Sequence, residues 1–244
     1  MASTITLTNT INWASQYLFS QPAALGAANE PAITIANVVK QAILGPPFKW
    51  RWNRAYLASA QALTAGTQDY QIGSLSTYGF MEKAFISHAD GSNVKEITKI
   101  VDGAMPGESV QGRPDNAIGD VLDDNAGNIT FRLSPVPDAS QSYLLQVIFQ
   151  KAATLFTTLG GTWAPIPDYM SYIYQYGFLG LLQAFNKDPR SQIYEQKFAA
   201  HLLGAQGGLS EMEKNIFLGN WLSTGLQIGT ANQQATMGVQ GRGQ

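Results

Sequence analysis

The sequence contains no cysteine and only two histidines, His88 and His201, in 244 residues. The absence of thiols excludes disulfides, thiolate nucleophiles and cysteine-ligated metals. Two histidines are too few for a multi-histidine metal site within one chain. The sequence therefore predicts no metal and no cofactor. His88 lies beside an expected hairpin turn and His201 in an amphipathic segment, so we expect both to be structural or solvated.

Charge is scarce as well. Charged residues make up 13% of the chain, about half of the roughly 25% that is usual in soluble proteins. Glu30 is the only charged residue from Met1 to Val39, and Arg242 is the only one from Asn215 to Gln244. Such a surface has little electrostatic protection against self-association. We therefore expect neighbouring molecules to cover both ends of the chain in an assembly.

The chain also lacks long apolar runs and a basic tail. No run approaches the roughly 18 residues of a membrane span, and the N-terminus lacks the layout of a signal peptide. The isoelectric point is about 5.6, which disfavours a nucleic-acid binder that works by counterion release. We expect no association with membranes.

The common catalytic motifs are missing too. There is no Gly-x-Ser-x-Gly elbow and no phosphate-binding glycine loop. Four aspartates lie in an expected acidic loop region: Asp115, Asp120, Asp123 and Asp124. They lack the ligand spacing of a calcium-binding loop. We therefore interpret them as solvated turn residues. A pair of glycosidase carboxylates has no fixed spacing, so this alternative stays open. We expect the chain not to be an enzyme.

Helical periodicity occupies both ends and strand-like periodicity the middle. Apolar steps of three and four residues predict helices around 7–18 and 32–43, the first capped by Thr8 or Asn9. Helices are also predicted over 168–186 and 189–205, and a Ser210/Glu213 capping box opens a further one. Short strands are predicted at 54–63, 67–72, 83–88, 94–100, 129–133 and 143–150, with a hairpin at Asp90-Gly91 and a long loop over 103–117.

The fold class is therefore α+β. We predict a helical body made from the N- and C-terminal helices, with an inserted antiparallel β-sandwich or open-barrel domain. The expected parts are residues 1–47 (N-terminal helices), 48–156 (β-rich domain), 157–220 (C-terminal helices completing the body) and 221–244 (an extended C-terminal arm).

A basic and aromatic segment opens the β-rich part. Three cations alternate with three aromatic residues, which are Phe48, Trp50 and Trp52. A nucleic-acid platform is possible in principle, but alternation in an extended segment favours aromatics inward and cations outward. Lys49, Arg51 and Arg54 are therefore a candidate cluster that faces DNA or a neighbouring subunit.

In order along the chain, several motifs resemble the head–tail adaptor (connector) proteins of tailed bacteriophages, including the tail-tubular-protein-A-like group. They are Phe48-Lys-Trp-Arg-Trp-Asn, Gly66-Thr-Gln-Asp-Tyr-Gln-Ile, Phe80-Met-Glu-Lys-Ala-Phe-Ile, Gln111-Gly-Arg-Pro, Ile129-Thr-Phe-Arg-Leu-Ser-Pro-Val-Pro-Asp and Trp163-Ala-Pro-Ile-Pro-Asp-Tyr. The resemblance spans roughly residues 30 to 205, and the order of the elements carries it.

The resemblance implies a structural protein of the virion, located at the head–tail interface and in the host cytoplasm during assembly. Such proteins form a ring, usually of twelve copies, that joins the portal to the tail or nozzle and passes double-stranded DNA through its bore with transient, non-specific contact. Adaptors dock through terminal arms, so apolar residues near the C-terminus are the expected partner interface: Trp221, Leu222, Leu226, Ile228 and Met237.

Two other functions stay open. The β-rich domain could recognise host carbohydrate, with tyrosines as stacking surfaces, and the chain would then be a binding module of the tail. A virion-associated glycan hydrolase is the other alternative.

Overall fold

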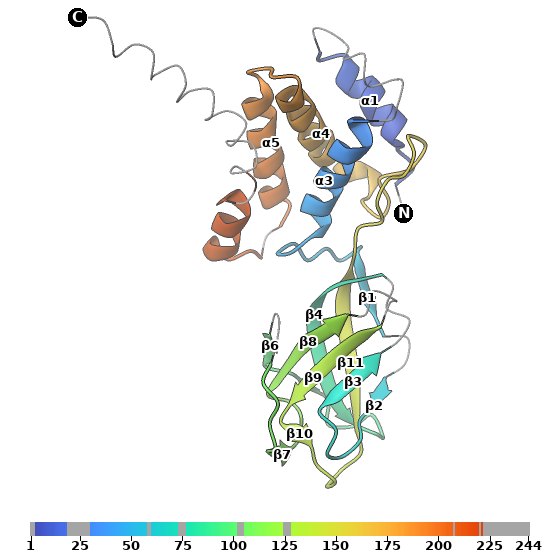
Figure 1. Cartoon of the computed structure of the whole chain (residues 1–244), viewed down its shortest axis with the longest axis vertical. Helices are drawn as coiled ribbons and strands as arrows, with labels where there is room; N and C mark the ends of the chain where they lie inside the picture. Colours follow the sequence, from blue (N-terminus) through green and yellow to red (C-terminus); the bar gives the residue numbers. More distant parts are fainter. Residues whose placement is uncertain are drawn as a thin grey trace, which may run out of the picture. The chain divides into compact units, whose positions relative to one another are not determined.

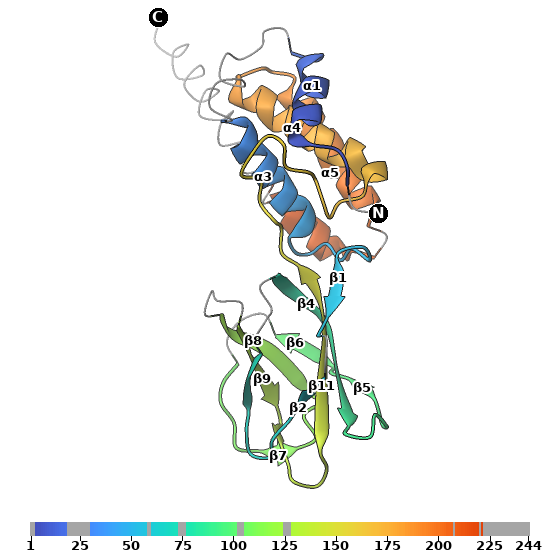
Figure 2. The same ribbon diagram turned by 90° about the vertical axis from the view of Figure 1, so that its right-hand side faces the viewer.

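The computed structural model of this chain describes residues 3–18, 30–57, 60–72, 77–101, 105–123, 128–206, 208–219 and 221. The chain divides into two compact units, Met1–Phe48 together with Thr154–Gln244, and Lys49–Ala153. We call them the helical unit and the β unit (Figures 1 and 2). Helices and sheets are segregated along the chain, so the predicted α+β class is confirmed.

The helical unit takes its elements from both ends of the sequence. They are α1 (Leu7–Ser15), α3 (Ala32–Leu44), the 3₁₀ turn η1 (Asp168–Met170), α4 (Ser171–Phe185) and α5 (Ser191–Gly204), and residues 211–219 are helical too. The predicted cap of the first helix was wrong: Thr6 is the N-cap, and its hydroxyl accepts a hydrogen bond from the Asn9 amide at 3.2 Å. The helix begins at Leu7, which is buried in the core, and the residue before it is therefore the cap.

The predicted capping box at the start of the last helical segment is confirmed. The Glu213 amide donates to the Ser210 hydroxyl at 3.2 Å, and the Ser210 amide donates to the Glu213 carboxylate at 2.8 Å. These reciprocal bonds satisfy backbone donors that would otherwise lack a partner at a helix N-terminus.

Helix α4 lies between α3 and α5 and is the centre of the helical unit (Figure 1). Gly177 allows this packing, because a Cβ atom there would lie 2.8 Å from the Phe198 ring on α5 and 2.9 Å from Val39 on α3. Both contacts are shorter than van der Waals distance, so the glycine permits close approach of the two neighbours. One turn later, Gly180 faces Glu195 of α5 in the same way.

Trp163 joins the segment before η1 to both ends of the chain. Its buried ring stacks on Tyr174 of α4, with centroids 4.2 Å apart, and its indole N–H donates to the Thr10 hydroxyl of α1 at 2.8 Å. The Trp163 amide donates to the Ile5 carbonyl at 3.1 Å. The side chain thus links α1 to α4, although 153 residues separate Thr10 from Trp163.

The β unit contains two larger sheets and one small one. Strand order is β1-β11-β4-β5, with β2 also on β11, in the first sheet, β3-β9-β8-β6 in the second, and β10-β7 in the third. The strands are β1 (Arg54–Tyr56), β2 (Gln61–Ala62), β3 (Asp69–Ile72), β4 (Tyr78–His88), β5 (Lys95–Glu96), β6 (Lys99–Val101), β7 (Gln111–Gly112), β8 (Ala117–Asp123), β9 (Ile129–Ser134), β10 (Val136–Pro137) and β11 (Tyr143–Lys151).

One apolar core joins the two larger sheets. Alternate residues of β9 and β11 are buried, as their period-2 pattern predicts. Side chains from both sheets meet in this core, among them Tyr70, Ile86, Ile118, Phe131, Leu145 and Val147.

The structure corrects three details of the predicted β-rich part. The sheets are mixed, because β6 pairs with β8, and β10 with β7, in parallel. The predicted strand at 54–63 is divided into β1 and β2, which pair with opposite parts of β11. The expected loop over 103–117 contains β7, and β8 follows it directly, so Asp120 and Asp123 are strand residues rather than loop residues.

No helix within the described ranges combines the length and apolar character that crossing a membrane requires.

Replacing Gly177 by alanine should overpack the junction of α3, α4 and α5. We expect the free energy of unfolding to fall by about 1–3 kcal/mol, measured by urea titration of the full chain. Gly204 at the end of α5 is the matched control, because an added Cβ there meets nothing within 4 Å. Gly204→Ala should be neutral or stabilising by up to about 1 kcal/mol; equal losses in both variants would contradict this packing.

The burial of Lys40 can be tested through the pH dependence of stability. Its ammonium group is buried beside the Phe156 ring, donates to the Thr162 carbonyl at 3.2 Å, and burial lowers its pKa from 10.5 to about 8. Between these pH values the unfolded chain binds more protons, so folding becomes more favourable as pH rises.

Lys40→Met removes the buried charge and, with it, this pH dependence. The free energy of unfolding of the variant minus that of the parent should therefore be larger at pH 7 than near pH 10, by up to about 3 kcal/mol. Urea titrations at the two pH values measure this difference. Lys99→Met, at an exposed position, is the control, and the same pH dependence in both variants would disprove the assignment.

Candidate functional site

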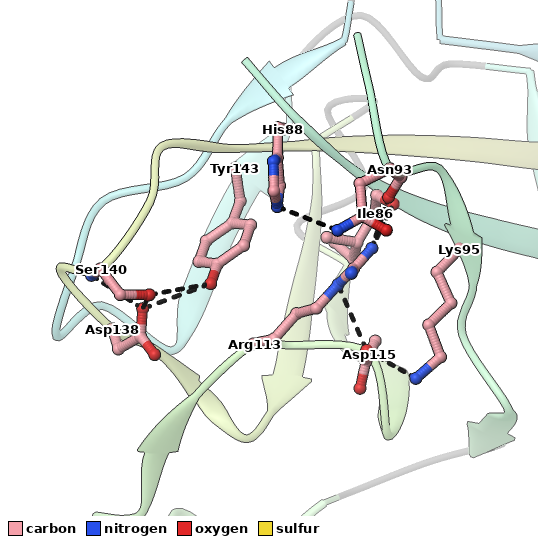
Figure 3. Close-up of polar contacts among 9 residues, drawn as sticks. All are labelled: Ile86, His88, Asn93, Lys95, Arg113, Asp115, Asp138, Ser140 and Tyr143. Atoms are coloured by element: carbon pink, nitrogen blue, oxygen red, sulfur yellow. Dashed lines mark hydrogen bonds and ion pairs between the residues drawn. The ribbon is translucent and has the colours of Figure 1, made fainter. Parts of the chain in front are cut away.

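A polar cluster surrounds the β4–β5 hairpin (Figure 3). The predicted Asp90-Gly91 turn is confirmed: Gly91 has a φ of +79°, and its amide donates to the His88 carbonyl at 2.9 Å. Only glycine adopts this left-handed conformation at no steric cost. The turn brings Asn93 next to His88, with the Asn93 amide nitrogen 3.3 Å from Nε2 of the imidazole.

Ion pairs connect the hairpin to the loop before β8. Asp115 lies between two cations, with Lys95 Nζ at 2.9 Å and Arg113 Nε at 3.2 Å from the same carboxylate oxygen. The Arg113 guanidinium also donates to the Asn93 carbonyl (Figure 3). The charges of the cluster are therefore used to hold two loops together.

The cluster does not have the geometry of a catalytic relay. The His88 ring lies against Tyr143, with centroids 6.0 Å apart, and a carboxylate that orients a histidine base is not among its contacts in the described ranges. Asp138 accepts from the Ser140 hydroxyl at 2.6 Å, and this bond holds the pKa of Asp138 below its usual value. A glycosidase acid needs the opposite shift.

The two predicted acidic residues whose side chains the structure describes, Asp115 and Asp120, have separate partners. Asp115 is ion-paired as described, and Asp120 on β8 accepts from the Tyr78 hydroxyl at 3.1 Å. Nothing is described of the Asp123 side chain, and Asp124 lies outside the described residues. Within the part of the chain that the structure covers, no three histidine or acidic side chains come close enough together to hold a metal ion.

The burial of the basic segment alternates as predicted, but the segment is not extended: residues 51–53 form a turn in which the Asn53 amide donates to the Trp50 carbonyl at 3.0 Å. Trp50 is buried and stacks on Trp52 at 5.1 Å, while Lys49 and Arg51 are exposed. Arg54 forms a two-point ion pair with Glu82, with Nε and Oε2 2.7 Å apart. The positive charge of Arg54 is therefore balanced within the β unit.

Glu82 is almost fully buried and belongs to a wider network. Its carboxylate also accepts from the Gln150 amide at 2.9 Å, and Gln150 accepts from the Trp50 backbone at 3.1 Å. Burial acts to raise the pKa of Glu82, but the hydrogen bonds from Arg54 and Gln150 outweigh it and lower the pKa.

The tyrosines in η1 and along α4 differ in their surroundings, since Tyr169 is 73% exposed whereas Tyr172 and Tyr176 contact rings of α5. Tyr176 stacks on His201 at 5.5 Å and on Tyr194 at 6.1 Å, and Tyr172 meets the edge of His201 at 5.1 Å. Lys197 lies over the Tyr194 ring at 5.3 Å. These faces are occupied by protein groups, as expected for helix packing.

The helical unit also has an apolar groove, with a volume of about 240 Å³. Three parts of the chain form its walls: α3 with the two prolines that follow it, α4, and the last helical segment. It is lined by Val38, Gln41, Ala42, Pro46, Pro47, Leu181, Ile216, Phe217 and Trp221. Val38 and Ile216 are 37% and 50% exposed. Exposed apolar surface beside a groove is typical of a site that binds a partner.

Of the predicted interface residues, Trp221 lies in this groove. Its indole is 7% exposed and packs on Phe198 with centroids 4.5 Å apart. Leu222, Leu226, Ile228 and Met237 lie outside the described residues. Val38 and Ile216 were not predicted as interface residues, because only the folded chain brings the two into one groove.

No protein-family model matches the chain, and no curated protein matches its sequence.

Glu82→Gln should lower the free energy of unfolding at pH 7 by about 1–3 kcal/mol, because it removes the charge-assisted bonds to Arg54. A lowered pKa means that the carboxylate stabilises the fold above its unfolded pKa and loses this effect as pH falls. In urea titrations, the difference in the free energy of unfolding between the parent and Glu82→Gln should therefore become smaller from pH 5 to pH 3.

Glu96→Gln is the matched control, since the Lys83–Glu96 pair is about half exposed and should contribute less than about 1 kcal/mol. A difference for Glu82→Gln that stays constant with pH would contradict the assigned role of its charge.

Proposed function

We propose that this chain is the subunit of a head–tail adaptor of a tailed bacteriophage. In this proposal, twelve copies form a ring that joins the portal to the tail or nozzle and lets the genome pass through its bore. The ordered set of motifs between residues 30 and 205 supports it. The finer arrangement belongs to the proposal too: a helical body, an inserted β-sandwich and an extended arm over 221–244.

The observation that carries the proposal is the apolar groove with its exposed rim. Val38 and Ile216 are partly exposed, and covering apolar surface gains about 25 cal/mol per Å². In the polar clusters of the β unit, by contrast, the charged side chains form ion pairs with one another. Among the described residues, the groove thus offers an apolar surface that is suited to contact with another protein.

Ring formation fits the scarcity of charge. A closed ring needs a heterologous contact between different patches of adjacent subunits, and interface cores are depleted of charged residues. The chain has a net charge of −2, and Glu82 balances Arg54 within the β unit. Lysine and arginine side chains bind DNA phosphates because the contact releases counterions from the DNA. A bore with few unpaired cations would therefore hold the DNA weakly and let it slide.

Deleting Gly225–Gln244 tests the proposal. We expect the truncated chain to stay folded, because Trp221 and the rest of the groove remain, and to lose stable attachment to the cognate portal. Co-sedimentation with portal particles measures attachment, and circular dichroism controls for folding. A folded truncated chain that attaches as well as the full chain would refute the assigned role of the arm.

A further inference from the structure

Trp221 is the last residue that the structure describes, and it lies in the wall of the groove. Its buried ring packs on Phe198 of α5, with centroids 4.5 Å apart. This packing fixes the point from which the rest of the chain continues, and that point is at the groove.

The size and lining of the groove define the rest of the occupant. Its volume of about 240 Å³ exceeds the roughly 150 Å³ of an apolar cavity that holds benzene, so one or two branched aliphatic side chains fit. Val38, Leu181 and Ile216 offer apolar contact and no charge. These features favour a peptide with aliphatic side chains and an uncharged backbone nearby.

The chain itself continues with such a peptide. Leu222, Leu226 and Ile228 follow Trp221 directly, and Arg242 is the only charged residue in the rest of the chain. Five residues from Trp221 to Leu226 reach at most about 17 Å, whereas α3 rises only about 6 Å from Val38 to Ala42.

Covalent attachment favours the C-terminal segment of the same chain over that of a second copy as the occupant of the groove. A short tether gives an effective concentration in the millimolar range, far above that of free subunits in solution. The segment also starts at the wall of the groove, so little of the tether is spent on reaching it.

We propose that, in the unassembled subunit, Leu226 and Ile228 occupy the groove of their own chain. The groove is thus the intramolecular seat of the segment that follows it. This inference does not rest on the proposed function; if the adaptor proposal holds, the seat keeps the arm's apolar residues from water before assembly.

The absence of native cysteine allows a direct test on the full chain. Gln41 lies at the groove and Gln227 lies between the two apolar residues, so Gln41→Cys with Gln227→Cys reports their proximity. We expect an intramolecular disulfide under mild oxidation, at a rate independent of protein concentration, scored by mass spectrometry and non-reducing gels.

The matched control adds Leu226→Ser and Ile228→Ser to the same cysteine pair, which leaves the tether length unchanged. We expect disulfide formation to slow by at least about tenfold, which corresponds to about 1.4 kcal/mol of docking. Equal rates with and without the serines would overturn the proposal. Disulfide-linked dimers that increase with concentration would overturn it in favour of a second copy.

Discussion

The helical unit depends on the segment from Phe156 to Asp168, which holds the two ends of the chain together. Trp163 donates to Thr10 on α1. Asn37 on α3 exchanges two hydrogen bonds with the Phe156 backbone, at 3.1 and 2.7 Å. The Asp168 carboxylate accepts from the Ser3 hydroxyl at 2.6 Å. Further bonds attach both helices to this segment, since the Lys40 ammonium on α3 donates to the Thr162 carbonyl and the Leu7 amide of α1 donates to the Gly161 carbonyl at 2.9 Å.

The groups that are already paired within the chain indicate which surface remains for a partner. In the β unit, the charged groups around Asp115 and Glu82 are paired internally, and the aromatic rings around Tyr176 are stacked on one another in the helical unit. The groove beside Trp221 is different, because its rim exposes apolar side chains and its buried indole N–H lacks an acceptor in the described part of the chain. Protein–protein contact is the use that this combination supports best.

Local patterns predicted much of the secondary structure, and contacts distant in sequence explain the rest. Periodicity located the helices and the strong strands at β9 and β11, and the Ser210/Glu213 spacing predicted a cap that is present. Strand β8 was missed because Gly119 and Asp120 interrupt its alternation, and pairing with β6 and β9 overrides that weak local pattern. The groove was not predictable, since Val38 of α3 and Ile216 of the last helical segment come to line one groove only when that segment packs beside α3 and α4.

The central claim is that this chain is a ring-forming subunit between portal and tail. Negative-stain electron microscopy of the full chain, alone and mixed with its cognate portal, tests it most directly. The account predicts rings stacked coaxially on the portal, with or without free rings in the unmixed sample. Portal particles that stay bare at saturating concentrations of the folded chain, with no rings in either sample, would contradict it.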